Sequence, residues 1–421
     1  MRCAVVGGGI IGLSIGWRLA ARGVEVQVFD AWAAGGSVLP MGKQSEALPM
    51  GKQSKAGAWF VAAGMLAAGN ESTWESAALG ELMVESARRW PGFAAELGVE
   101  LPDAGTLVVA LTADDVAEAE REWARRPGHR PSPDPHSGQR PGPHSGQRPG
   151  PHPGQRPGPH PGPHPGQRPG PPPGGMVAAG ELGGAAAGQR LLEVSRAKHL
   201  GPSALREAEP ALSPRVRAGC HLPEDRQVDP RKVVAALRER VLVVPEKVDD
   251  LADLDADQVV VAAGVGTARL AGLPVRPVKG ELLRLRGEPG LLRHVISGYA
   301  DGRRVYLVPR ADGEIVVGAT QDERTDDVVT AGAVLELLRA ATDLVPALAD
   351  CAITETLVGH RPSTPDNAPL LGRLDGRTVI ASGHHRNGVL LAPVTADLIA
   401  DLIVTGEPDP LLAPFAPGRF T

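Results

Sequence analysis

The sequence contains few cysteines. There are three cysteines, Cys3, Cys220 and Cys351, which are widely separated and form no C-x-x-C pair. An odd, scattered set argues against a disulfide framework or a metal site and is typical of reduced thiols in the cytosol. We therefore expect a cytoplasmic protein that holds no structural metal.

The sequence also lacks long apolar runs and a strong charge of either sign. No apolar run approaches the ~18 residues that a membrane span requires. A net charge of -5 gives no basis for binding nucleic acid or an anionic membrane. Since 421 residues exceed the ~250 to 300 at which one hydrophobic core stops growing, we expect two domains.

A glycine-rich turn near the N-terminus is the strongest local motif. An apolar strand over 3–6 leads into Gly7, Gly9 and Gly12, then a helix, then a second strand that ends at Asp30. Gly7 permits the tight turn, Gly9 lets the backbone approach a pyrophosphate, and Gly12 lets the helix pack on the sheet. Asp30 lies where a ribose hydroxyl needs an acceptor. A ligand-free turn or a signal peptide are the alternatives, but a run of glycines weakens a signal helix, and the pattern predicts a dinucleotide-binding unit.

Two insertions interrupt this pattern. Residues 39–47 read LPMGKQSEA and residues 48–56 read LPMGKQSKA, a tandem duplication that predicts a lengthened loop. Between 127 and 175, PGPHSGQR and PGPHPGQR recur and 18 of the 41 prolines occur. Such a stretch buries no core and predicts a disordered or polyproline-like arm. Six of the twelve histidines lie in it, but nothing in the repeats would fix metal ligands, so we favour a solvated spacer.

Elsewhere strand and helix patterns alternate. Apolar residues at helical spacing cover 79–93, and strands are expected over 106–111, 259–263 and 379–381. Asp229 and Pro230 predict the start of another helix. We expect the strands near both chain ends to share one sheet and an apolar helix to start at Gly388.

Six segments carry a family resemblance. They are VVGGGIIGLSIGWRLA from residue 5, AAGML from 62, VYLVPR from 305, GATQ from 318, GHRPSTPDNAPLLG from 359 and GHHRNGVLLAP from 383. Together they resemble the D-amino-acid oxidase family of flavoproteins, and within it the glycine oxidase branch of thiamine biosynthesis. The resemblance implies an α/β fold: an FAD-binding Rossmann-like domain with a second, mainly antiparallel-sheet substrate domain. It also implies non-covalent FAD, oxidation of an amine next to a carboxylate, and a homo-oligomer, which is a tetramer in the family.

The resemblance also suggests substrate-binding and catalytic residues. A planar carboxylate is matched by the donor fork of arginine, and Arg361 stands in the G-H-R-P context where the family places its carboxylate clamp. Arg386 resembles the second arginine of the pocket, and Tyr306, one of only two tyrosines, resembles the tyrosine that helps hold the carboxylate. For each of them a surface or packing role is the alternative.

The expected flavin contacts lie at both ends of the chain and in its middle. A helix starting at Gly388 would aim its positive end at the reduced flavin, which favours hydride transfer without a general base. Near the motifs, His360, His384 and His385 are the only candidate bases, and we expect them to be structural. The expected cofactor-binding residues are Gly7, Gly9, Ile10, Ile11, Gly12, Asp30, Ala63, Gly64, Met65, Val248, Ala263, Gly264, His385, Arg386, Asn387, Gly388, Val389 and Leu390.

These expectations combine into a division of the chain and a function. The FAD-binding domain is predicted to comprise 1–98, 225–275 and 355–421, the substrate domain 99–127, 176–224 and 276–354, and the insertion 128–175. The predicted activity is oxidation of glycine by oxygen to glyoxylate, ammonia and hydrogen peroxide. A dehydrogenase or oxidase acting on a D-amino acid, sarcosine or proline, and a flavin-binding scaffold with a proline-rich arm, are the alternatives.

Overall fold

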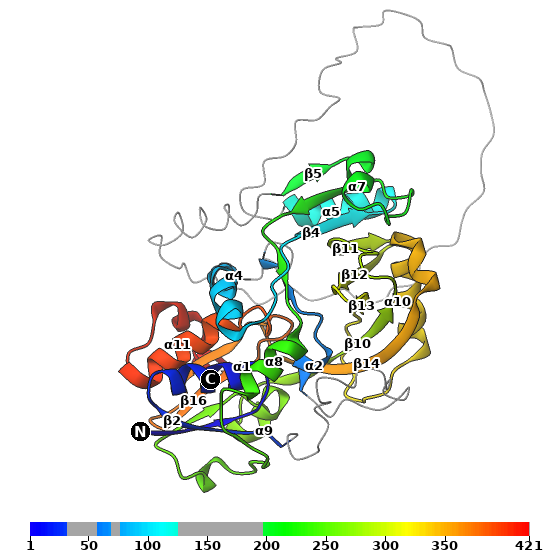
Figure 1. Ribbon diagram of the computed structural model, residues 1–421. Coiled ribbons are helices and arrows are strands. Elements are labelled where there is room, and N and C mark those ends of the chain that lie inside the picture. Colours follow the sequence, from blue (N-terminus) through cyan, green and yellow to red (C-terminus); the bar gives the residue numbers. More distant parts are fainter. Residues whose placement is uncertain (32–56, 69–75, 125–196, 421) are drawn as a thin grey trace, which may run out of the picture.

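The computed structural model describes residues 1–31, 57–68, 76–124 and 197–420 (Figure 1). The duplication at 39–56 and the insertion at 128–175 lie outside these ranges. The described residues form two large sheets, one near the chain ends and one built from the middle of the chain.

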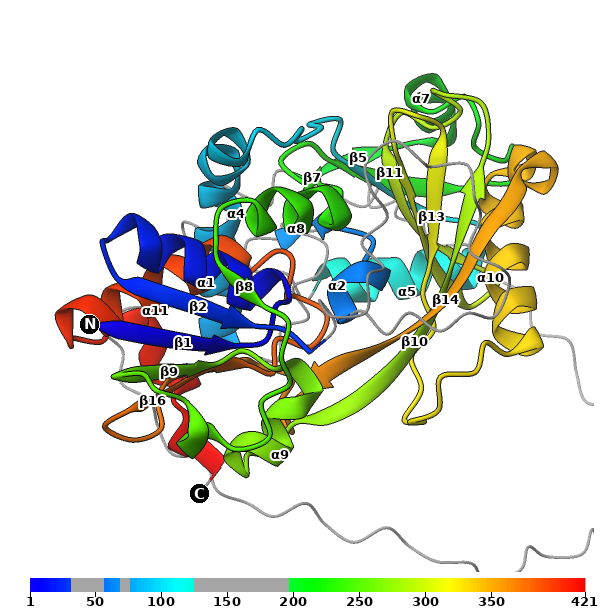
Figure 2. The ribbon, with the colours of Figure 1, turned by 60° about the horizontal axis from the view of Figure 1, so that its bottom comes forward.

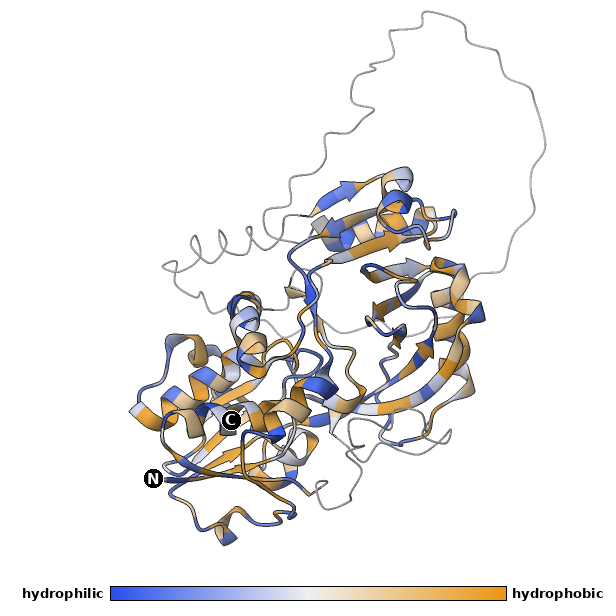
Figure 3. Cartoon of the chain, viewed as in Figure 1, coloured by the Kyte–Doolittle hydropathy of each residue, from blue (hydrophilic) through white to orange (hydrophobic). Residues whose placement is uncertain are grey.

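The first sheet has six strands and unites both ends of the chain, as predicted. β1 pairs in parallel with β2 on one side and with β9 on the other, and β9 pairs in parallel with β16. Of these strands, β1, β9 and β16 are largely apolar and buried (Figure 3), whereas β2 is buried only at Val28. In spatial order the strands are β15 (Leu370–Arg373), β16 (Thr378–Ser382), β9 (Gln258–Val261), β1 (Arg2–Val6), β2 (Glu25–Phe29) and β8 (Val243–Val244).

Four helices pack beside this sheet and close its main core. The side chain of Ser76 caps α4, and Asp229 caps α8 with Pro230 in the first turn, as predicted. Leu13, Trp90 and Leu398 belong to one buried cluster shared by these helices. None of the helices within the described ranges is both long and apolar enough to cross a membrane. The four are α1 (Ile10–Ala21), α4 (Ala77–Leu97), α8 (Pro230–Arg238) and α11 (Ala392–Thr405).

The start of α11 differs from the prediction. The helix begins at Ala392 rather than Gly388, and residues 388–391 form turns. Pro393 explains the shift, because proline has no amide proton to donate and is tolerated in the first helical turn only. In addition, the carbonyl of Leu390 accepts hydrogen bonds from Ser86 and Trp90 of α4.

The second sheet has eight strands and is mainly antiparallel, as the resemblance implied. Only β11 and β4 pair in parallel. α10 (Ala331–Leu344) covers one face, while α2 (Ala58–Val61) and β3 (Met65–Leu66) lie against the other. In spatial order the strands are β14 (Ala352–Ser363), β10 (Arg276–Arg286), β13 (Glu314–Gly318), β12 (Arg303–Pro309), β11 (Val295–Ala300), β4 (Thr106–Ala110), β6 (Ala218–Leu222) and β5 (Lys198–Leu200).

Two long strands connect the regions of the two sheets. β10 and β14 pair along their length and reach from the second sheet toward the first (Figure 2). The predicted domain boundary between 354 and 355 falls inside β14, and the other boundaries stay predictions. Apart from short 3-10 helices, the remaining described elements are α5 (Ala113–Ala124), α7 (Pro202–Ala208), α9 (Thr267–Ala271) and β7 (Arg226–Gln227), which pairs with β3.

Candidate cofactor and substrate site

The carboxyl ends of four parallel strands meet at one edge of the six-stranded sheet (Figure 2). β1 ends before Gly7, β2 before Asp30, β9 before Ala262 and β16 before the loop 383–391. In open α/β sheets this edge is where ligands bind. The fold therefore brings together candidate cofactor residues that lie hundreds of positions apart.

The glycines of the first turn differ in whether the fold leaves room for a Cβ atom at their positions. A Cβ at Gly7 would overlap the carbonyl of Ala262, and a Cβ at Gly12 would overlap the carbonyl of Gly7. The fold itself requires both glycines. Among the described residues, a Cβ at Gly9, in contrast, would meet only Trp59, at 3.5 Å. Packing within the protein does not require glycine there, which leaves room for close approach of a ligand.

The N-terminus of α1 can receive an anion. Within the described residues, no side chain caps this helix at Gly9. The first-turn amides, including those of Ile10 and Ile11, have no acceptor within their own helix, and such amides bind phosphates well. These are the groups that the sequence predicted to contact a pyrophosphate.

Asp30 lies at the predicted strand end but already contacts protein groups. Its side chain is 6% exposed and pairs with Arg238 of α8, and a Cβ at Gly8 would overlap its carboxylate. Its amide donates to the carbonyl of Val244 at 2.9 Å. Arg238 thus orients this carboxylate, a contact that sequence spacing did not reveal.

The segment 63–65 lies at the junction between the two sheets. Gly64 has a φ of +79°, and its carbonyl accepts a hydrogen bond from the amide of Val228 at 2.9 Å. Arg310 donates to the carbonyl of Ala63 and to Oε1 of Gln227. Met65 is buried in the cluster below α2. The arginine that ends the VYLVPR motif therefore holds the AAGML motif in place.

Three further residues predicted to contact the cofactor follow β8 and β9. Gly264 has a φ of +56°, and its carbonyl accepts a hydrogen bond from Ser382 at 3.1 Å. Ala263 and the half-buried Val248 pack against a cluster on one face of the first sheet. The carbonyl of Val248 accepts a hydrogen bond from Arg269 at 2.9 Å.

The loop 383–391 is tied to β14. The amide of His385 donates to the carbonyl of Pro362 at 2.8 Å, and Nδ1 of His385 lies 2.5 Å from the hydroxyl of Ser363. His385 adopts a φ of +48°, which is uncommon for a residue other than glycine. Gly388 lies between the buried Asn387 and the buried pair Val389 and Leu390. Sequence reasoning missed the contact with Ser363.

His385 is neutral at pH 7. Burial, together with the nearby positive charges of Arg361, Arg386 and Arg276, lowers its pKa to about 4. Two arginines that the sequence assigned to substrate binding therefore lie near one side chain. The structure brings Arg361 and Arg386 together across the junction of β14 with the loop.

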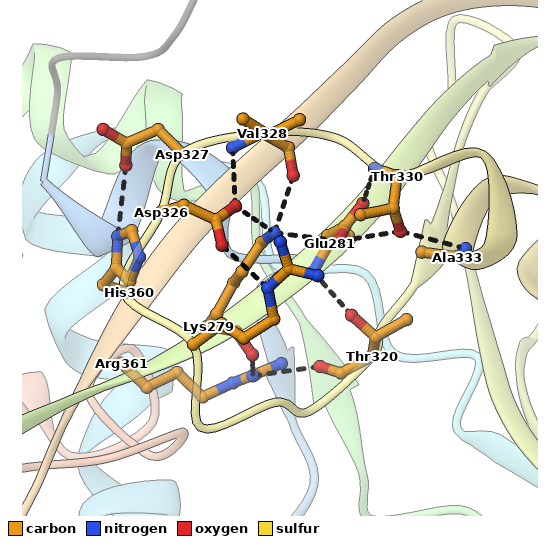
Figure 4. A network of polar contacts seen from close by, with 11 residues as sticks. Lys279, Glu281, Thr320, Asp326, Asp327, Val328, Thr330, Ala333, His360 and Arg361 are labelled. Atoms are coloured by element: carbon orange, nitrogen blue, oxygen red, sulfur yellow. Dashed lines mark hydrogen bonds and ion pairs between the residues drawn. The ribbon is translucent and has the colours of Figure 1, made fainter.

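Arg361 and Tyr306 lie on the same face of the second sheet. Tyr306 is opposite Gly318, which is opposite Leu282, and Leu282 is in turn opposite Leu357 on β14. Directly paired residues share a face and faces alternate every residue, so Arg361, four residues after Leu357, is on this face too. Nη1 of Arg361 donates to the carbonyls of Thr320 at 3.1 Å and Lys279 at 3.4 Å (Figure 4).

The comparisons with known proteins agree with this geometry. The family model described as DAO, FAD dependent oxidoreductase, matches residues 2–137 and 162–402. The chain belongs to this family of FAD-dependent oxidoreductases. Among solved structures, that of glycine oxidase from Geobacillus kaustophilus is similar to this chain, with a TM-score of 0.72 and 26% sequence identity. The similarity covers 99% of this chain and 99% of the glycine oxidase chain.

Two relatives are similar in sequence over part of the chain. A bifunctional protein ThiO/ThiG from Synechocystis is 38% identical over 51% of this chain and 36% of its own length. Glycine oxidase from Geobacillus kaustophilus is 38% identical over 38% of this chain and 44% of its own length. The matching sequence segments thus span less than half the length of each of these two relatives.

The residues at the sheet edge fit FAD, the cofactor of the family. Gly9 leaves its backbone open, and the uncapped start of α1 offers amides for a pyrophosphate. Oδ1 of Asn387 is a buried acceptor for which the described residues supply no hydrogen-bond partner. A buried polar atom of this kind needs a partner, and a ligand can supply it.

Proposed function

We propose that this chain is an amino-acid oxidase that acts on glycine and supplies the thiazole branch of thiamine diphosphate biosynthesis. The overall reaction converts glycine, oxygen and water to glyoxylate, ammonia and hydrogen peroxide. One observation supports the proposal most directly. Arg361 and Tyr306 share a sheet face whose end is joined, through Ser363 and His385, to the loop at the cofactor edge.

In this proposal Arg361 binds the substrate carboxylate. A guanidinium presents paired donors that match a carboxylate, and two carbonyls already hold Arg361 in place. The hydroxyl of Tyr306 donates a hydrogen bond to the same carboxylate, and Arg386 adds positive charge beside that carboxylate. These contacts orient the substrate so that its Cα faces the cofactor edge.

Cofactor binding is proposed for the residues along the sheet edge. Gly7, Gly9, Ile10, Ile11 and Gly12 would hold the pyrophosphate, and Asp30, oriented by Arg238, would hold the ribose. The isoalloxazine ring would contact the segments at 63–65, 263–264 and 385–390, and Val248 would lie near the adenine. Bound FAD supplies a two-electron acceptor that oxygen regenerates with formation of hydrogen peroxide.

No histidine of the loop is suited to remove a proton from the substrate. Burial lowers the pKa of His384 to about 3, and the pKa of His385 is about 4. Groups this weakly basic make poor general bases near neutral pH. We therefore propose that the substrate reacts as the neutral amine, and that the two histidines hold the loop in position.

The test is an assay of purified protein for flavin and for peroxide. We expect an absorbance band near ~450 nm from bound FAD and peroxide release with glycine in preference to sarcosine, proline or D-amino acids. Reduction of a dye without peroxide would indicate the dehydrogenase alternative instead. We also propose a homo-oligomer, which light scattering of the same sample would test.

A further inference from the structure

The strand that pairs with β14 contacts Arg361 through its backbone, at the carbonyl of Lys279 and at Gly280. Lys279 and Glu281 of β10 project toward α10, as do Leu283 and Leu285, while Gly280 lies on the opposite face with Arg361. We propose that Lys279, Gly280 and Glu281 are positioning residues that set the place and angle of the Arg361 guanidinium for a small carboxylate ligand. This inference rests on the proposed function and deepens it.

Gly280 makes room for the guanidinium. A Cβ at Gly280 would lie 2.5 Å from Nη1 of Arg361 and 2.7 Å from its Cζ, closer than carbon atoms pack. The guanidinium therefore lies directly on the backbone of β10. Gly318 does the same for Tyr306, because a Cβ there would overlap the tyrosine ring and hydroxyl. Glycine inside a strand commonly marks such a close approach.

Lys279 and Glu281 hold a segment of chain that follows β13. The Nζ of Lys279 lies 2.9 Å from Oδ1 of Asp326, 2.6 Å from the carbonyl of Val328 and 3.2 Å from Oε1 of Glu281 (Figure 4). Oε2 of Glu281 accepts a hydrogen bond from the amide of Thr330 at 2.7 Å. The segment 319–330 leads from β13 into α10, and its C-terminal part is thus held by hydrogen bonds to Lys279 and Glu281.

The same segment begins at the carbonyl that orients Arg361. The amide of Thr320 donates to the carbonyl of Glu281 at 3.1 Å, and its hydroxyl accepts from the amide of Glu281 at 2.9 Å. The carbonyl of Thr320 then accepts from Nη1 of Arg361. A continuous series of contacts therefore leads from the Lys279 ammonium to the candidate substrate clamp.

The charge on Lys279 is needed for this arrangement. The side chain is fully buried, and burial disfavours the ammonium, but hydrogen bonds to Asp326 and Glu281 outweigh that effect and raise the pKa of Lys279. An apolar replacement would leave the buried Glu281 carboxylate without its cation. We expect the segment 319–330, and with it the Thr320 carbonyl, to shift in response.

The experiment compares Gly280→Ala and Lys279→Met with matched controls in the FAD-loaded protein. Gly298→Ala is the control for glycine, because Gly298 is also crowded within a strand but meets Leu344 and Val109 instead. Lys247→Met is the control for lysine, because Lys247 pairs with Asp249 at the surface. Two quantities are measured: steady-state kinetics with glycine, and the affinity for acetate from the change it causes in the flavin spectrum.

We expect both test variants to raise KM for glycine by about tenfold or more, to change kcat by less than about threefold, and to weaken acetate binding in parallel. Lys279→Arg should recover part of the loss because it keeps the charge. Faster cleavage by trypsin after Arg324 in Lys279→Met would support release of the segment. The controls should keep KM and acetate affinity. Unchanged KM and acetate affinity in Gly280→Ala would overturn the inference.

The design separates this inference from the proposed function. If the unmodified protein oxidises no amino acid but binds acetate, and Gly280→Ala abolishes that binding, the function is wrong and the positioning role stands. If glycine is oxidised and Gly280→Ala behaves as Gly298→Ala does, the function stands and the positioning role is wrong. If Lys279→Met fails to fold, the kinetics and acetate affinity of Gly280→Ala alone test the positioning role.

Discussion

The hydroxyl of Ser363 lies 2.5 Å from Nδ1 of His385, so the last residue of β14 contacts the loop that leads to α11. Arg361 lies two residues before Ser363, and Arg386 directly follows His385. The contact therefore joins the strand that carries the candidate substrate clamp to the loop at the cofactor edge. His385 is partly withdrawn from solvent in this position, and the free energy of unfolding should therefore depend on its protonation.

Replacing His385 should reduce the acid sensitivity of the fold. The unfolded chain protonates this histidine near pH 6.5 and the folded chain only near pH 4. Between these values the unfolded state binds more protons, so the free energy of unfolding falls as pH decreases. His385→Asn does not titrate, and asparagine tolerates positive φ. We expect it to diminish the loss of stability between pH 7 and pH 4.5 by about 1 to 2 kcal/mol in denaturant titrations.

The control for that prediction is the unmodified protein at the same two pH values. His384 has a lowered pKa as well, so part of the acid sensitivity should remain in the His385→Asn variant. An identical pH dependence in both proteins would contradict the assignment of a half-buried, neutral His385.

Two glycines of the first turn should respond differently to alanine. Gly9→Ala adds a Cβ that the protein can accommodate, so unfolding of the apoprotein should be unchanged while the affinity for FAD falls by about tenfold or more. Gly12→Ala places a Cβ into the carbonyl of Gly7 and should destabilise the fold itself. Fluorescence titration with FAD and denaturant unfolding distinguish the two. Equal FAD affinity in Gly9→Ala and the unmodified protein would argue against a pyrophosphate there.

Removing the guanidinium of Arg361 should damage substrate use. Truncating one member of a buried charge pair costs about 2 to 5 kcal/mol, so Arg361→Ala should lower kcat/KM for glycine by about 10² to 10³ or more. Arg361→Lys keeps the charge but loses the paired donors and should recover little. Arg286→Ala, at an exposed ion pair on β10, is the control. Near-normal kinetics for Arg361→Ala would refute the clamp.

A separate ionic cluster should stabilise the junction between α2 and the second sheet. Glu355 accepts two hydrogen bonds from Arg231 at 3.0 and 2.8 Å and lies 3.8 Å from the buried Arg284. Arg231 also lies over the ring of Phe60 in α2. Because Glu355→Gln leaves these cations undercompensated, we expect a loss of about 2 to 4 kcal/mol in the free energy of unfolding.

Chemical denaturation at pH 7 measures that loss. Asp249→Asn, which removes an exposed partner of Lys247, should leave the unfolding midpoint in place. Equal midpoints for Glu355→Gln and Asp249→Asn would show that the cluster adds no stability.

Local signals in the sequence determined several elements of this protein. The turn at Gly7, the entry into α1 and the Asp229–Pro230 cap of α8 depend on φ angles and hydrogen bonds within a few residues. Interactions of this kind join residues that are neighbours in the sequence, so these elements were predictable from it. The family motifs added the assignments of Arg361, Tyr306 and Arg386, which local patterns alone do not contain.

The tertiary structure alone decided where these groups meet. The carbonyl of Leu390, just before α11, accepts hydrogen bonds from Ser86 and Trp90, some 300 positions away, and the orientation of Asp30 depends on Arg238. The register of four strands places Arg361 over Gly280 and Tyr306 over Gly318. Such contacts join residues whose separation along the chain has no regular period, so only the folded arrangement of strands brings them together.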